Sequence, residues 1–133
     1  MMQSVADLVV KVDAARRRLT LQFGMSTDGA AYRRAMSGWL ESSPEAVGYD
    51  WLYDLRRYGG SVHHDDVTAF AATYEQLAQG RDEGARSVFV SPDSGFRLWV
   101  QACALRFPRR IFAVVETLAE AERELAKGRQ RPG

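Results

Sequence analysis

The chain has 133 residues, of which 46% are hydrophobic and 26% charged, and its formal net charge is +1. This length suits one domain with its own core, and the composition is that of a globular protein rather than a disordered chain. The near balance of charge argues against a dedicated nucleic-acid-binding protein, which needs a clear positive excess.

The cysteine count and the hydropathy pattern limit the cellular setting. Cys103 is the single cysteine, which excludes an internal disulfide and a cysteine-rich zinc site. No segment approaches the roughly 18 consecutive apolar residues of a membrane span. The first residues also lack the basic and long apolar regions of a secretory signal. We therefore expect a cytoplasmic protein without a membrane span.

The first predicted elements are two short strands, at residues 8–12 and 18–23. The first is apolar and β-branched, and in the second Leu19, Leu21 and Phe23 alternate with polar residues. The polar residues between the two strands predict a hairpin, with the strands antiparallel.

A helix is predicted next, because Ser26, Thr27 and Asp28 supply side-chain oxygens of the kind that start helices. The apolar residues between 32 and 40 recur at helical spacing and form one face. Pro44 ends this helix, since the residue before a proline avoids the helical conformation.

The rest of the chain alternates strands with helices. The predicted strands cover residues 49–55, 87–90 and 111–115, and the helical stripes run over 67–78, 96–107 and 118–125. In the last helix Thr117 and Glu120 fit a capping box, and Leu118, Ala121 and Leu125 are expected to face inward. The polar tail at 128–133 is expected to fray.

This order predicts an α/β fold with one mixed sheet of about five strands and four helices. After the opening hairpin, the alternation indicates parallel strands joined by right-handed crossovers. Residues 1–127 are expected to form a single domain.

Three local features, together with the element order, carry a resemblance to a known family. One predicted strand ends in Asp54-Leu55-Arg56, ahead of a loop and an acidic helix start. A second, Val88-Phe89-Val90, leads into a Pro-Asp turn, and the segment VVETLAEA at 114–121 closes the pattern. Over about residues 9–125 the chain is similar to the SpoIIAA-like proteins, relatives of the STAS domain of anti-sigma-factor antagonists.

The resemblance implies a non-enzymatic module that binds partner proteins. In some STAS domains a partner kinase phosphorylates a serine, within an Asp-Ser-Ser-Gly type of motif, at the start of the helix after the central strand. The matching place here falls near His63, where no Asp-Ser pair occurs, and Ser61 lacks a preceding Asp. The phosphorylation site is therefore not carried over.

The cluster His63-His64-Asp65-Asp66 is the strongest candidate for a metal site. Neighbouring residues of a helix point about 100° apart, however, and paired ligands usually stand at i and i+4. We interpret the cluster as an exposed helix start in which the acidic residues favour the helix dipole, and we expect no bound metal.

Other patterns are interpreted as structural. Gly59-Gly60-Ser61 lacks the ending of a phosphate-binding loop, so it predicts a flexible turn and no nucleotide cofactor. Cys103 lies on an apolar helix face and is expected to be buried and inert. Asp50 and Asp54 are assigned to loops and helix caps rather than to a pair of acids. Trp39, Trp51 and Trp99 are assigned to core packing. The pairs Arg56-Arg57 and Arg109-Arg110 could meet an anion, but they are interpreted as solvated edges.

Ligands of open α/β sheets bind outside the carboxyl ends of the parallel strands. At that edge the sequence places a candidate interaction rim made of Asp54, Arg56, Ser61, His63, Ser91 and Asp93. Ser94, Glu116, Thr117 and residues 25–27 are expected at the same edge.

Three classes of function follow. The first is a protein-interaction or regulatory module that uses the rim and the helix at 64–79, with its oligomeric state open and a homodimer among the options. The alternative is a domain that binds a small molecule, apolar or lipid-like, between helices and sheet. An enzyme is least favoured, because no nucleophile, base and orienting group can be assembled.

Overall fold

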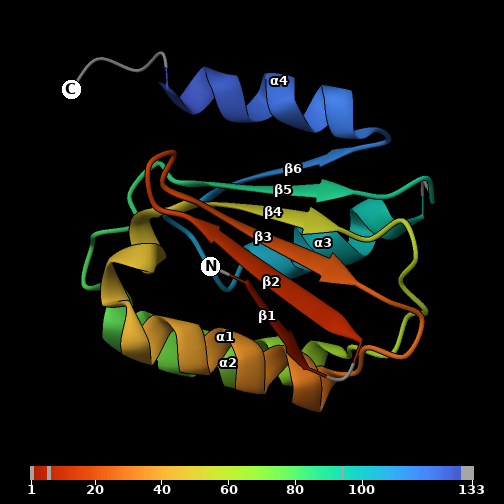
Figure 1. Cartoon of the computed structure of the whole chain (residues 1–133), viewed down its shortest axis with the longest axis horizontal. Helices are drawn as coiled ribbons and strands as arrows, with labels where there is room; N and C mark the ends of the chain where they lie inside the picture. The colour runs from red at the N-terminus through yellow and green to blue at the C-terminus, as the bar shows by residue number, and fades with distance from the viewer. Residues whose placement is uncertain (1, 6, 94, 130–133) are drawn as a thin grey trace.

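The sheet has six strands that lie side by side in chain order (Figure 1). The computed structural model describes residues 2–5, 7–93 and 95–129. The first three strands pair antiparallel, and the last three continue parallel to the third. The strands are β1 (Met2–Val5), β2 (Leu8–Asp13), β3 (Arg18–Phe23), β4 (Asp50–Asp54), β5 (Arg86–Val90) and β6 (Ile111–Val115). The predicted α/β fold, the opening hairpin and the alternation after it are confirmed.

The strand β1 was not predicted from the sequence. It pairs with β2 from Met2 opposite Lys11 to Val5 opposite Leu8, which makes the sheet one strand wider than expected. Its four residues contain a single β-branched residue, so no strand pattern is visible. Asp7, which directly precedes β2, takes a φ of 66°.

Four α-helices connect or follow the strands in the described part of the chain. They are α1 (Gly29–Ser42), α2 (His64–Ala78), α3 (Phe96–Ala104) and α4 (Leu118–Arg129), with a short 3₁₀ helix, η1 (Pro44–Gly48), after α1. Asp28 caps α1, as expected, because its carboxylate accepts a hydrogen bond of 2.9 Å from the amide of Ala31. The helix α4 extends through residues 128 and 129, where a frayed tail was expected, and residues 130–133 of that tail lie outside the described residues.

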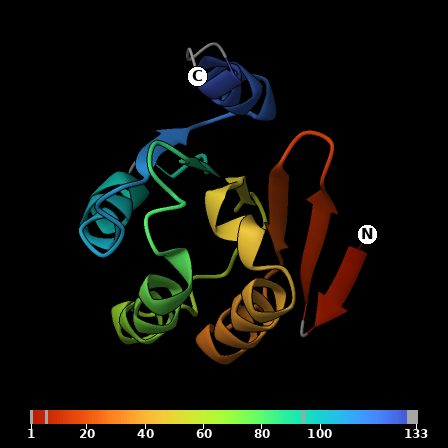
Figure 2. The ribbon, with the colours of Figure 1, turned by 90° about the vertical axis from the view of Figure 1, so that its left-hand side faces the viewer.

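Three helices cover one face of the sheet and the fourth covers the other (Figures 1 and 2). The crossovers from β3 to β6 each step one strand in the same direction. Because crossovers of one handedness that step in one direction place their helices on the same face, α1, α2 and α3 share a side. α4 follows the last strand and packs on the opposite side, mostly over β5 and β6.

Alternate residues of each strand supply the two cores. On β4, Trp51 and Tyr53 point into the larger core with α1 and α2, whereas Leu52 points into the smaller one with Ala121 and Leu125 of α4. This alternation is the period of two that a strand imposes on its side chains. Leu118 is 38% exposed, so its predicted inward orientation is wrong; it occupies the first position of α4.

The interpretation of Arg109-Arg110 as a solvated edge is also wrong. Arg110 is buried, and its guanidinium donates hydrogen bonds to the carbonyl oxygens of Val47, Tyr49 and Arg86 and to the hydroxyl of Ser87. Arg109 instead forms ion pairs of 2.8 Å with Asp82 and Glu75. Both arginines tie the loop before β6 to neighbouring elements.

Candidate binding site

The strand ends β4 and β5 lie next to each other at the edge where the rim was predicted. Asp54 pairs with Val90, and the amide of Leu55 still donates to the carbonyl of Val90 at 2.9 Å. Beyond this point the chain after β4 turns toward α2 and the chain after β5 turns toward α3. Both connections run to the same face of the sheet, and a cleft lies between the two loops that follow the strands.

This cleft, which we call the rim cleft, has a volume of about 410 Å³. Its walls are the loop after β4, the loop after β5 and the first turns of α3. The lining residues are Leu55, Arg56, Tyr58, Gly59, Gly60, Val62, Ser91, Pro92, Asp93, Gly95, Phe96 and Trp99. Three residues of the predicted rim therefore meet in one cleft: Arg56, Ser91 and Asp93.

Asp54 holds Arg56 in a fixed position. The Nε and Nη2 atoms of Arg56 donate to the two carboxylate oxygens of Asp54 at 2.9 and 2.8 Å, a bidentate arrangement. These side-chain hydrogen bonds keep the pKa of Asp54 below its ordinary value, although partial burial opposes them. Asp54 itself faces a second hollow of about 460 Å³, which Arg56 and Arg57 also line.

The β5 side of the cleft presents Ser91 and Asp93. Ser91 is only 7% exposed, and its hydroxyl oxygen accepts a hydrogen bond of 3.2 Å from the amide of Asp93. The carboxylate of Asp93 accepts a hydrogen bond of 2.9 Å from the amide of Gly95. These short-range bonds fold the loop back on itself and keep both side chains at the edge of the cleft.

Ser61 and His63 do not reach the rim cleft, although both were predicted with the others. Ser61 forms an isolated parallel bridge with Asp28, which joins the loop after β4 to the start of α1. The amide of His63 donates to the carboxylate of Asp66 at 3.0 Å, at the start of α2. Both residues are too far along the chain after β4 to lie at the strand end. Ser61 lies beside the start of α1, and His63 lies at the start of α2.

The remaining residues expected at this edge are also dispersed. Thr27 is buried, and its hydroxyl donates to the carbonyl of Asp7 at 2.9 Å, so it has a structural role. Glu116 and Thr117 are exposed beyond β6. Thr117 caps α4, because its hydroxyl accepts a hydrogen bond of 3.1 Å from the amide of Glu120. Ser94 lies outside the described residues.

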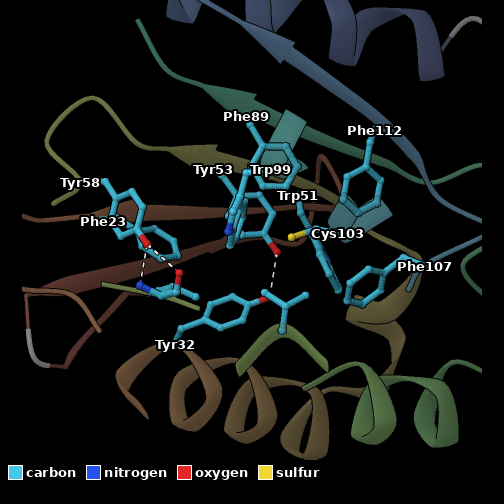
Figure 3. Close-up of a pocket in the computed structure, with 12 residues that line it drawn as sticks. Phe23, Tyr32, Trp51, Tyr53, Tyr58, Phe89, Trp99, Cys103, Phe107 and Phe112 are labelled. Atoms are coloured by element: carbon cyan, nitrogen blue, oxygen red, sulfur yellow. Dashed lines mark hydrogen bonds between the residues drawn. The ribbon is translucent and has the colours of Figure 1, made fainter. Parts of the chain in front are cut away.

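Directly beneath the rim cleft is a narrow cavity of about 30 Å³ between the sheet and the helices α1, α2 and α3 (Figure 3). Its lining is aromatic except for Val62, Val67 and Cys103. The aromatic lining residues are Phe23, Tyr32, Trp51, Tyr53, Tyr58, Phe89, Trp99, Phe107 and Phe112. The sequence allowed an apolar ligand between helices and sheet, but the tryptophans were assigned to packing and no lining residues were identified. Periodicity shows which residues point inward but not how well they fill the space.

Two buried hydroxyl groups meet inside the aromatic cavity. The hydroxyls of Tyr32 and Tyr53 are 3.5 Å apart, and Figure 3 shows them pointing toward each other. This separation is longer than the 2.5–3.0 Å that is usual between hydroxyl oxygens. Burial raises the pKa of Tyr53 to about 12 and that of Tyr32 well above its ordinary value, so both remain protonated and can donate.

Cys103 lines one side of the cavity, and the Nδ1 atom of His64 lies 4.0 Å from its sulfur. Cys103 is buried, as expected, and burial raises the pKa of its thiol to about 12, which leaves it a poor nucleophile at neutral pH. The ring of His64 packs on Trp99 with the ring centres 5.2 Å apart. Among the residues that the structure describes, no group of three or more His, Cys, Asp or Glu side chains could hold a metal ion.

Comparisons with known proteins add no family: neither a protein-family model nor a curated protein sequence matches this chain. Within residues 2–5, 7–93 and 95–129, no helix has the length and apolar character that crossing a membrane requires.

Proposed function

We propose that this chain is a STAS-like, non-enzymatic interaction or regulatory module that binds a protein partner at the rim cleft. The observation that carries the proposal is the Asp54–Arg56 pair at the end of β4. It holds a half-exposed guanidinium rigidly at the side of an open cleft. A side chain that is fixed before binding loses little conformational entropy on binding, which favours its use as a contact residue.

Two further features support this proposal. The STAS resemblance was drawn from an opening hairpin followed by alternating strands and helices, and this is the order of the elements from β2 to α4. The loop after β4 is also held in place, because Gly59 packs directly on the backbone of Met25 and leaves no room for a side chain. Gly60 has a φ of 91°, which favours glycine at this turn.

A matched pair of charge reversals tests the proposed surface. Arg56 lines the rim cleft, whereas its neighbour Arg57 lines only the second hollow. Arg56→Glu should abolish capture of the partner in a pull-down from the native cell lysate, and Arg57→Glu should leave it intact. Equal capture by both variants, with melting temperatures close to that of the wild type, would place the partner surface elsewhere.

The aromatic cavity favours a second candidate function, the binding of an apolar or lipid-like small molecule. An apolar pocket with a few convergent polar groups is the usual form of a ligand site. Native mass spectrometry of the purified protein distinguishes the two candidates. A co-purified small molecule supports the second, and a chain of unmodified mass that still captures its protein partner supports the first.

A further inference from the structure

The rim cleft and the aromatic cavity are parts of one continuous site. Both are lined by Tyr58, Val62 and Trp99. Trp99 is half-buried and stacks on Phe96, with ring centres 5.1 Å apart, so it forms the wall between the two spaces. A molecule that lies on Trp99 in the cleft is therefore already next to the cavity.

The inner part of the site suits an apolar group. At about 30 Å³ the cavity can hold a water molecule, but an alkyl chain or ring needs more space. The wall that can move to give this space is Trp99, because its side chain is half-buried and faces the cleft on one side. The hydroxyl of Tyr58, by contrast, accepts a hydrogen bond of 2.6 Å from the amide of Val62. The other aromatic rings pack against the sheet or the helices and restrict the direction in which the cavity can widen.

The outer part of the site presents a cationic hydrogen-bond donor. Asp54 occupies the Nε and Nη2 atoms of Arg56, while Nη1 donates to no residue in the described part of the chain. The guanidinium is thus oriented by one carboxylate and has donors left for another anion. Charge-assisted hydrogen bonds of this kind are the stronger ones in proteins.

Ser91 supplies a second donor beside Arg56. Its oxygen accepts from the amide of Asp93, but its hydroxyl proton has no acceptor within residues 2–5, 7–93 and 95–129. Ser91 directly follows Val90, which pairs with Asp54, and Ser91 and Arg56 both line the rim cleft. A buried hydroxyl without an acceptor is better satisfied by a ligand than by the protein alone.

We propose that the rim cleft and the cavity together bind one amphipathic small molecule. Its anionic end, a carboxylate or a phosphate ester, lies at Arg56 and Ser91, and its apolar end passes Trp99 into the aromatic cavity. This inference rests on the small-molecule function proposed above and adds that one end of the ligand carries a negative charge. The carboxylate of Asp93 lies on the same wall as Ser91 and weakens the binding of an anion, so its removal should strengthen binding.

Isothermal titration calorimetry with decanoate and 1-decanol at pH 7.5, below the micelle concentration, tests the charge preference. The two probes share a chain length and differ in the headgroup. Decanoate should bind at least tenfold more tightly than 1-decanol, and Arg56→Gln should weaken decanoate binding about tenfold, because it removes the charged donor. Arg57→Gln is the matched control and should leave binding unchanged, and Asp93→Asn should tighten it.

The outcomes separate this inference from the function on which it rests. Equal affinity for both probes, unaffected by Arg56→Gln, would overturn the anionic end while leaving the apolar site in place. Failure of both probes to bind would overturn the small-molecule site as well, whereas partner capture at the rim would be unaffected. Decyl phosphate in the same titration distinguishes the two headgroups: tighter binding than decanoate assigns a phosphate ester, and weaker binding a carboxylate.

Discussion

The guanidinium of Arg110 lies over the ring of Trp51, with its central carbon 3.8 Å from the ring centre. The same guanidinium donates to the carbonyl oxygens of Val47 and Tyr49, each at 2.7 Å. One buried side chain thus joins the loop before β6 to η1 and to the central strand β4. The aromatic cavity has Trp51 in its lining, so this contact also supports the candidate site from below.

Replacement of this residue should therefore be costly. Arg110→Ala leaves several buried acceptors without a donor and removes the cation from the Trp51 ring, and we expect a loss of about 3 kcal/mol or more in unfolding free energy. Urea unfolding followed by circular dichroism measures the loss. Arg106→Ala, at an exposed position nearby, is the control and should change stability by less than about 0.5 kcal/mol. Equal effects of the two changes would show that the Arg110 contacts contribute little.

A charge at Leu52 should destabilise the smaller core. Leu52 is 5% exposed and packs with Val88 and Leu125 between β4, β5 and α4. Leu52→Asp should cost several kcal/mol, on the order of 3 or more, because an unpaired carboxylate is buried there. The half-exposed Leu118 offers the matched change, Leu118→Asp, which should be tolerated. A Leu52→Asp protein that melts within two degrees of the wild type would contradict the packing of α4 on this face.

The carboxylate of Asp82 should make stability depend on pH. Asp82 is fully buried; burial alone would raise its pKa, but hydrogen bonds from Tyr74 and Arg109 outweigh it and the pKa is lowered. A pKa below the unfolded value of about 3.9 means that the ionised form stabilises the fold above about pH 4. This contribution is lost as the pH falls through the folded-state pKa.

Urea titrations between pH 7 and pH 2.5 measure this effect. The wild type should lose unfolding free energy in the acidic part of this range, and Asp82→Asn should lose less over the same interval because its side chain does not titrate. Asp54 has a lowered pKa for a similar reason, so part of the slope should persist in that variant. An identical slope in both proteins would mean that Asp82 titrates normally.

The strands and helices with a strong periodic pattern could be predicted from the sequence. Leu19, Leu21 and Phe23 alternate along β3, and the helical faces that carry Met36 and Phe70 are buried as their spacing indicated. The strand β1 could not be predicted, because its stability comes from pairing with β2 rather than from its own residues. Arg110 could not be distinguished from a surface arginine, since its partners are backbone carbonyls far away in the sequence.

The candidate site was predicted in part. The strand end at Asp54 and the turn at Ser91 could be located because ends of parallel strands share one edge. Ser61 and His63 were placed there too, but the chain after β4 continues toward α2 before it reaches them. The aromatic cavity depends on how Tyr58, Val62 and Trp99 pack across three elements, and a linear pattern carries no information about that packing.

Zinc binding gives a further prediction about His63 and His64. His63 immediately precedes α2, whereas the ring of His64 packs on the ring of Trp99. The two imidazole rings therefore have different neighbours. We expect no stoichiometric zinc by elemental analysis after dialysis against a low zinc concentration. One zinc per chain that disappears in a His63→Ala variant would contradict this prediction.

Photo-crosslinking at the rim cleft tests the central claim most directly. A photoreactive phenylalanine in place of Pro92, an exposed residue of the cleft wall, samples whatever binds there in the native cell. The control position is Gly38, which is exposed on α1 and has open space for a side chain. Adducts of defined mass at position 92, protein or small molecule, and none at position 38 are the result that we predict. Adducts at position 38 alone, or equal adducts at both positions, would contradict a binding site at the rim cleft.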